Sequence, residues 1–170
     1  LANINTIAAT AKHFAGYAFA EAGRDYNTVD VSDTTLRNVI LPPFKAAADA
    51  GVATFMNSFN DHDGIPATGS RYLQNTILKG EWDYRGLMVS DWGSIGEMIQ
   101  HGFSYDLTDA AEQAINAGND IDMESSAYIQ HLDTLVNADR VSMQTLNNAV
   151  RRVLTLKFQM TLMLLFLIHL

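Results

Sequence analysis

The feature of this sequence that most constrains its fold is an alternation between short apolar runs and longer stretches with helical spacing. Each apolar run ends in a cluster of polar residues, and the runs recur at intervals of about 35 to 45 residues. Strand, loop and helix repeated in this way are typical of βα units around a parallel sheet. The predicted strands are IAATAK at 7–12, ATFMNS at 53–58, LMVS at 87–90 and DIDM at 120–123.

Helices are predicted between these runs from capping residues and from apolar residues three or four positions apart. Ser32 is a candidate N-cap for a helix through Ile40, and Pro42-Pro43 begins a second helical piece. Three further helices are predicted: an apolar stripe from Tyr72 to Leu78 closed by Gly80, an alanine-rich stretch at 109–117 that stops at Gly118, and a last helix opened by Ser142 with Val150, Leu154 and Phe158 on one face.

The predicted strands lack polar alternation, which is expected of strands whose two faces are both covered. The fold class is therefore α/β, and the length of 170 residues taken alone suggests a single domain. In such folds the functional side chains gather on the loops that follow the carboxyl ends of the strands. The strand ends are therefore the place to look for chemistry.

Composition excludes several other classes of protein. With 48% hydrophobic residues the chain is not of the disordered type, and without cysteine it holds no disulfide and no cysteine-ligated zinc. A net charge of −8 disfavours a nucleic-acid partner, because an acidic surface repels phosphates. The apolar run at the C-terminus, about 11 residues, is well short of the ~20 that a membrane span needs, so no membrane partner is expected.

Polar and aromatic residues of complementary kinds follow the four predicted strands. If they converge on one rim, an ammonium group, an imidazole, a carboxylate and an indole lie together, which suits a sugar: its apolar ring face stacks while its hydroxyls are hydrogen-bonded. These residues are Lys12-His13 after the first strand, the segment 57–61 after the second, Asp91-Trp92 after the third and Met123-Glu124 after the fourth. Glu124 is thus a candidate rim residue near the sugar.

Asp91 is the sharpest candidate, because it stands where the apolar run at 86–90 emerges from the predicted sheet. Its carboxylate has three open interpretations: a nucleophile, a metal ligand, or an N-cap for a helix that starts near Ser94. The acidic loop at 61–64 is interpreted as a polar turn rather than a metal loop, since a calcium loop needs a longer ligand series. No metal and no cofactor are expected.

At this point the residues carry a resemblance to a known family. The chain resembles the barrel domain of glycoside hydrolase family 3, and most closely its β-glucosidase branch. The matching stretches, in family order from about residue 3 to residue 159, are KHFAGYAFAEAGRDYN, VDVSDTTLRNVILPPFKAAADAGVATFMNSFND, GIPATGSRYL, ILKGEW, RGLMVSDWGSIGEMI and AVRRVLTLKF.

The resemblance implies a retaining mechanism, in which terminal β-D-glucosidic bonds are hydrolysed in two steps. Asp91, in the SDW motif, matches the catalytic nucleophile. The substrate-binding residues that it implies are Lys12 and His13, which hydrogen-bond the hydroxyls of the sugar in the −1 subsite, Met56 and Trp92, which line that sugar site, and Phe59, which stands where some members carry a tyrosine. Arg24 and Asp25 are interpreted as a pair that orders the loop after the first strand.

The resemblance also implies that the chain is part of a larger whole. A (β/α)8 barrel typically needs about 250 residues, so this chain corresponds to about the second half of such a barrel. The expected division is a partial catalytic barrel domain at 1–159 and an atypical apolar tail at 160–170, for which a non-native origin is one interpretation. The implied partners are a β-glucoside or oligosaccharide substrate, the missing barrel strands, and a later domain that supplies the acid/base glutamate. A periplasmic or secreted location fits the parent protein.

Two alternative functions stay open at this point. One is a Schiff-base lyase on an α/β barrel, with Lys12 as the amine nucleophile. The other is a carbohydrate-binding remnant that keeps Lys12, His13 and Trp92 but does not catalyse a reaction.

Overall fold

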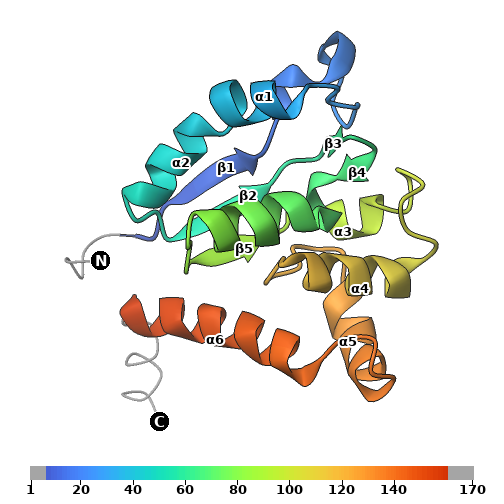
Figure 1. Cartoon of the computed structure of the whole chain (residues 1–170). Helices are drawn as coiled ribbons and strands as arrows, with labels where there is room; N and C mark the ends of the chain where they lie inside the picture. Colours follow the sequence, from blue (N-terminus) through green and yellow to red (C-terminus); the bar gives the residue numbers. More distant parts are fainter. Residues whose placement is uncertain (1–6, 161–170) are drawn as a thin grey trace.

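A small parallel sheet lies at the centre of the computed structural model, which describes residues 7–160 (Figure 1). The sheet has the strand order β1-β2-β5, with β1 at Thr10–Phe14, β2 at Thr54–Asn57 and β5 at Leu87–Val89. The parallel register brings the carboxyl ends of all three strands to one edge. The predicted α/β class is confirmed, and these strands lie within a few residues of the predicted runs.

The prediction of a fourth strand at 120–123 is wrong. Within the described chain only Ile121 of this segment pairs with the sheet, through a single parallel bridge to β5. The side chain of Asp122 accepts a hydrogen bond of 3.1 Å from the amide of Ser125, which turns the chain toward α5 (Ala127–Asn137). Local side-chain hydrogen bonds therefore replace the ladder that a longer strand would make.

Several helix ends follow the predicted capping residues. The hydroxyls of Ser32 and Ser142 accept hydrogen bonds from the amides of Thr35 and Thr145, at 3.1 and 3.0 Å, as expected of N-caps. Gly118 ends its helix with φ of 107°, a conformation that favours glycine. The helices are α1 (Asp33–Thr35), η3 (Leu36–Ile40), α2 (Pro42–Asp49), η5 (Tyr72–Glu81), α3 (Ser94–Glu97), α4 (Leu107–Ala117), α5 and α6 (Met143–Gln159).

The predicted helix stop at Gly80 is wrong, because η5 continues to Glu81. The amide of Trp82 still bonds to the carbonyl oxygen of Ile77, at 3.0 Å, so the hydrogen-bond ladder runs past the glycine. The other connections are short: the single-turn helices η1 (Tyr17–Phe19), η2 (Glu21–Gly23) and η4 (Ala67–Gly69), and a hairpin of β3 (Asp61–His62) with β4 (Ile65–Pro66).

The buried apolar side chains form two clusters, one from residues 14–88 and one from residues 95–149. In Figure 1 α1 and α2 lie above the sheet and η5 in front of it, whereas α4, α5 and α6 form the lower part. The first cluster joins the sheet to η3 and η5 through Phe14, Leu36, Phe55, Leu73, Ile77, Leu78 and Met88, all fully buried. The second cluster joins α3, α4, α5 and α6 through Ile95, Met98, Ala110, Ala114, Leu135 and Ala149.

A buried carboxylate, that of Asp120, ties the sheet to both flanking helices. Its Oδ2 accepts a hydrogen bond of 2.9 Å from the amide of Met88 in β5, and its Oδ1 lies 2.8 Å from Nη1 of Arg152 on α6. The ammonium group of Lys79 on η5 lies 3.4 Å from the same Oδ1 and also donates to the carbonyl oxygen of Gly118. This network fixes β5 just before the strand ends.

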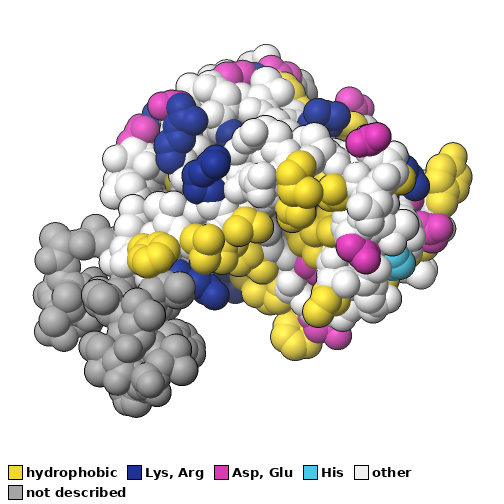
Figure 2. All heavy atoms as spheres, turned by 90° about the horizontal axis from the view of Figure 1, so that it is seen from below, with side chains coloured by type: hydrophobic (Ala, Val, Ile, Leu, Met, Phe, Trp, Pro, Cys, Tyr) yellow, Lys and Arg dark blue, Asp and Glu magenta, His cyan; other side chains and the backbone are white. Residues whose placement is uncertain are grey.

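The lower surface of the molecule carries hydrophobic side chains. Figure 2 shows them gathered across the face seen from below, and exposed apolar residues of α6 include Val150, Leu154 and Phe158. Among the described helices, none is long and apolar enough to cross a membrane. Except for Met160, the predicted tail at 160–170 lies outside the described residues.

Candidate active site

The candidate site begins where β5 ends and the chain turns into α3. The carboxylate of Asp91 is largely buried there, with 8% of the residue exposed. Its Oδ1 accepts a hydrogen bond of 2.7 Å from the amide of Trp92. The N-cap of α3 is Gly93, which makes no side-chain cap, and the amide of Ser94 donates to the backbone oxygen of Asp91 rather than to its carboxylate. The N-cap interpretation of Asp91 is therefore wrong.

The second oxygen of Asp91 is free of hydrogen bonds among the described residues. Oδ2 is buried, and Nε2 of His13 lies 3.3 Å from it. His13 stands on β1, the strand on the far side of β2 from β5, and its imidazole is about one third exposed. The parallel pairing of the strands thus brings His13 and Asp91, which are far apart in sequence, close together in space. One oxygen of the Asp91 carboxylate is left without a hydrogen bond among the described residues.

Lys12 adjoins His13 in sequence and Trp92 adjoins Asp91, and both side chains are solvent-exposed. The side chain of Lys12 on β1 is exposed, and no ion pair of its ammonium group is present in the described part of the chain. Trp92 is 65% exposed, which leaves its indole face open at the rim. The sugar-binding roles of Lys12 and Trp92 stay predictions.

Met56 and Phe59 lie on and after β2, next to β1 in the sheet. Met56 is partly buried at the third position of the strand. The ring of Phe59 lies between two tyrosines, 6.1 Å from the ring of Tyr17 and 4.6 Å from that of Tyr26 between centroids. Phe59 is therefore part of an aromatic row, and no hydroxyl at this position faces the site.

Glu124 lies on the loop that follows the bridge to β5. Its backbone has φ of 80°, which is uncommon for a residue other than glycine. The loop is held by a hydrogen bond of 2.8 Å from the amide of Met123 to Oγ of Ser90, and by one of 2.9 Å from Gly93 to the carbonyl oxygen of Met123. A β-carbon at Gly93 would lie 3.6 Å from Oε2 of Glu124, so this carboxylate stands near the turn that carries Asp91.

Sequence reasoning did not assign a site role to Tyr17 and Glu97, two polar residues that lie close to His13 and Asp91. The hydroxyl of Tyr17 donates a hydrogen bond to Oδ1 of Asp25, and its ring lies 5.1 Å from that of His13. Burial raises the pKa of Tyr17 well above its ordinary value, and the hydrogen bond to Asp25 adds to the shift. Burial also raises the pKa of Glu97 on α3, followed by the charges of Asp25 and Asp91. These contacts join loops that no local sequence pattern connects.

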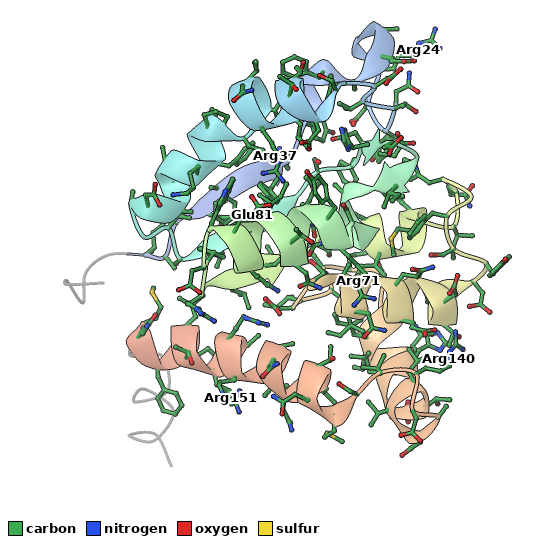
Figure 3. All side chains as sticks on the ribbon, in the orientation of Figure 1. Arg24, Arg37, Arg71, Glu81, Arg140 and Arg151 are labelled. Carbon is green, nitrogen blue, oxygen red and sulfur yellow. The ribbon has the colours of Figure 1, made fainter. Side chains whose placement is uncertain are left out.

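The interpretation of Arg24 and Asp25 as a loop-ordering pair is wrong for the described chain. Arg24 extends from the outer end of the molecule, away from the sheet, whereas Arg37 and Glu81 point toward each other (Figure 3). Asp25 instead accepts hydrogen bonds from Tyr17 and from the amide of Tyr26, the latter at 2.9 Å. A tyrosine hydroxyl therefore orders this loop.

The loop at 61–64 is the turn of a hairpin, as predicted. Asp63 and Gly64 have φ of 55° and 74°, and they join β3 to β4. Among the described residues, no group of three or more histidine and carboxylate side chains has a geometry that would hold a metal ion. The role of Asp91 as the nucleophile stays a prediction.

Comparison with known proteins identifies the family of the chain. The model of the glycosyl hydrolase family 3 N-terminal domain matches residues 3–156. The chain belongs to glycosyl hydrolase family 3. It is 40% identical over 157 residues to a periplasmic β-glucosidase of Salmonella typhimurium, and 33% identical over 168 residues to a β-xylosidase of Formosa agariphila. These alignments cover 92% and 93% of this chain, but only 20% and 23% of the relatives.

Solved structures of family 3 members have the same fold over this region. A β-glucosidase of Listeria innocua in complex with glucose superposes with a TM-score of 0.93 and 40% identity, over 95% of this chain and 22% of that one. A variant of the same enzyme was solved with laminaribiose. The described structure is therefore part of a (β/α)8 barrel, about its second half, and the chain spans about a fifth of the length of the family 3 relatives it matches.

Proposed function

We propose that this family 3 domain carries the nucleophile and part of the −1 sugar site of a β-glucosidase-type glycoside hydrolase that retains anomeric configuration. One observation carries the proposal: Asp91 ends a buried strand with one carboxylate oxygen unpartnered, beside His13 and an exposed Trp92. The relatives named as β-glucosidases, in Salmonella typhimurium and Bacteroides ovatus, support the choice of a β-glucoside as substrate.

The chemistry follows from the two oxygens of Asp91. Oδ1 is held by the amide of Trp92, which fixes the carboxylate plane, and Oδ2 is the oxygen that attacks the anomeric carbon. The bond from that carbon to the leaving-group oxygen breaks as the bond to Oδ2 forms, and the leaving oxygen takes a proton from the acid/base residue. Water then attacks the glycosyl ester and restores the carboxylate, so two inversions retain the configuration.

The sugar itself is held by the residues around this carboxylate. Lys12 and His13 donate hydrogen bonds to its hydroxyls, the indole of Trp92 stacks on its apolar face, and Met56 and Phe59 border the pocket from β2. Glu124 accepts hydrogen bonds from hydroxyls at the rim. We assign no acid/base within this chain; a later domain of the parent protein supplies it.

The proposal includes the domain division and the cellular location. Residues 1–159 form part of the catalytic barrel and 160–170 an atypical tail, of which 161–170 lie outside the described residues. The barrel strands absent from this chain and the later domain are its partners in the parent protein. The location is periplasmic or secreted, which the periplasmic relative of Salmonella typhimurium supports.

The two alternatives differ in how the site would act. A Schiff-base lyase needs an amine desolvated enough to be neutral, whereas the Lys12 side chain is exposed. A carbohydrate-binding remnant would bind the sugar but would not hydrolyse the glycoside. Only a measurement of turnover therefore distinguishes it from an enzyme.

Binding of isofagomine, a cationic glucose mimic, tests the site in the chain as it stands. Calorimetric titration is expected to show binding that falls at least tenfold in Asp91→Asn, because the cation loses its carboxylate partner. The matched control is Asp63→Asn, which removes the same charge from the exposed hairpin turn. Equal binding by both variants, or no binding by the unmodified chain, would refute the assignment.

A further inference from the structure

Burial alone does not fix the orientation of the His13 ring. Its Nε2 lies 3.3 Å from Oδ2 of Asp91, and about one third of the side chain is exposed to solvent. The torsion between the β-carbon and an imidazole has broad minima, so rotation about it would turn Nε2 away from the carboxylate. An exposed imidazole of this kind binds a ligand well only where a neighbouring side chain holds it in place.

The ring of Tyr17 is such a neighbour. Its centroid lies 5.1 Å from that of His13, with an angle of 40° between the two planes. The two residues are four positions apart, and the chain turns between them at Gly16, where φ is 97°. That conformation favours glycine, and a β-carbon there would lie only 3.4 Å from Nδ2 of Asn60. The turn at Gly16 therefore places one ring against the other.

Tyr17 is itself held on two sides. Its hydroxyl donates a hydrogen bond to Oδ1 of Asp25, and its ring packs edge-on against that of Phe59, with 6.1 Å between the centroids. Asp25 is fixed in turn by the amide of Tyr26, which donates a hydrogen bond of 2.9 Å to the same oxygen. The ring of Tyr17 is thus a fixed surface beside the exposed imidazole of His13.

The loop that carries Asp25 is closed by hydrogen bonds that do not involve Tyr17. The amide of Glu21 donates to the carbonyl oxygen of Thr28 at 2.9 Å. The side-chain amide of Asn27 donates to the carbonyl oxygen of Glu21 at 3.0 Å. A substitution of Tyr17 therefore removes the ring beside His13 and leaves these bonds of the loop intact.

We propose that Tyr17 is a positioning residue of the sugar site: its ring keeps the imidazole of His13 turned toward Asp91, and its hydroxyl, bound to Asp25, keeps the ring in place. The inference rests on the proposed function, because it takes His13 to bind a hydroxyl of the sugar at Asp91. Tyr17 acts on the sugar only through His13. Its removal therefore weakens binding only in a chain that still has the imidazole.

A double-mutant cycle on isofagomine affinity, measured by calorimetric titration, tests this coupling. Tyr17→Leu is expected to weaken binding about fivefold, the effect of losing one neutral hydrogen bond, but less than twofold in a chain that carries His13→Ala. Tyr17→Phe keeps the ring, and its loss is expected to be smaller, about twofold. The matched control is Tyr105→Leu, at a tyrosine that is 94% exposed, which is expected to change neither affinity.

The cycle distinguishes positioning from a merely structural role. Equal losses for Tyr17→Leu with and without His13, or no loss in either chain, would overturn the inference and leave the sugar site at Asp91 in place. Circular dichroism shows first whether Tyr17→Leu folds. If it does not, the same cycle is run with Tyr17→Phe, and a loss that persists in His13→Ala would overturn the inference.

The NMR signal of the Hε1 proton of His13 tests the contact without any ligand. A neighbouring aromatic ring displaces this signal, so Tyr17→Leu is expected to shift it, whereas Tyr17→Phe is expected to leave it close to its position in the unmodified chain. An unchanged signal in Tyr17→Leu would overturn the inference whether or not isofagomine binds. A displaced signal in a chain that does not bind isofagomine would refute the proposed function and keep the contact between the two rings.

Discussion

Replacement of Asp120 by alanine should destabilise the chain far more than a typical surface substitution. The carboxylate has only 2% of its side-chain surface exposed, and it is the shared partner of three donors. These are the amide of Met88 at 2.9 Å, Nη1 of Arg152 at 2.8 Å and Nζ of Lys79 at 3.4 Å. Asp120→Ala leaves a buried amide without an acceptor and two cations without their counter-charge.

The expected loss of unfolding free energy is about 3–5 kcal/mol, the range for removing one partner of a buried ion pair. Arg152 and Lys79 contribute most of it, since burial makes an uncompensated cation expensive. Asp120→Asn keeps an acceptor for the amide of Met88 while it removes the charge. Its loss is expected to be smaller, about 1–3 kcal/mol.

Urea denaturation followed by circular dichroism at pH 7 measures these losses from the shift of the midpoint at constant slope. The matched control is Asp49→Ala, because Asp49 pairs with Lys45 on the exposed face of α2 and should matter little. An Asp120→Ala variant no less stable than Asp49→Ala would refute the assignment of this carboxylate as the link between the sheet and its helices.

Three further predictions concern a buried lysine, a helix end and turnover. Burial lowers the pKa of Lys79 to about 8, whereas the unfolded chain keeps a value of about 10.4. The unfolded state therefore binds more protons between these values, and the wild type should gain stability relative to Lys79→Met as the pH rises from 7.5 to 9.5; equal changes in urea midpoints would contradict this. Gly118→Ala should cost about 1–3 kcal/mol, because φ is 107° and a β-carbon would lie 2.5 Å from Oδ1 of Asn75. Gly102→Ala, with φ of 71° and open space, should cost less in the same assay. The chain on its own should hydrolyse aryl β-glucosides very poorly, and robust turnover that Asp91→Asn abolishes would contradict this.

The fold was predictable where local chemistry decides it. The caps at Ser32 and Ser142 and the stop at Gly118 follow from side-chain and backbone preferences, and the structure confirms them. The failures lie where other interactions override local preference. At Gly80 the hydrogen-bond ladder of η5 continues, and after Ile121 side-chain hydrogen bonds end the strand.

The candidate site also has a part that the sequence predicts and a part that it does not. The polar residues at strand ends were predictable because parallel strands bring their carboxyl ends together, and the contact between His13 and Asp91 follows from that topology. The contacts of Tyr17, Tyr26 and Glu97 were not predictable, since they join segments distant in sequence.

Trapping of the glycosyl-enzyme tests the central claim most directly. The full-length protein that carries this domain is treated with a 2-deoxy-2-fluoro-β-glucoside, which slows breakdown of the covalent intermediate, and its peptides are examined by mass spectrometry. The predicted result is a fluoroglucosyl ester on the peptide that contains Asp91, absent when that residue is asparagine. A label on a different carboxylate would contradict the assignment of Asp91 as the nucleophile.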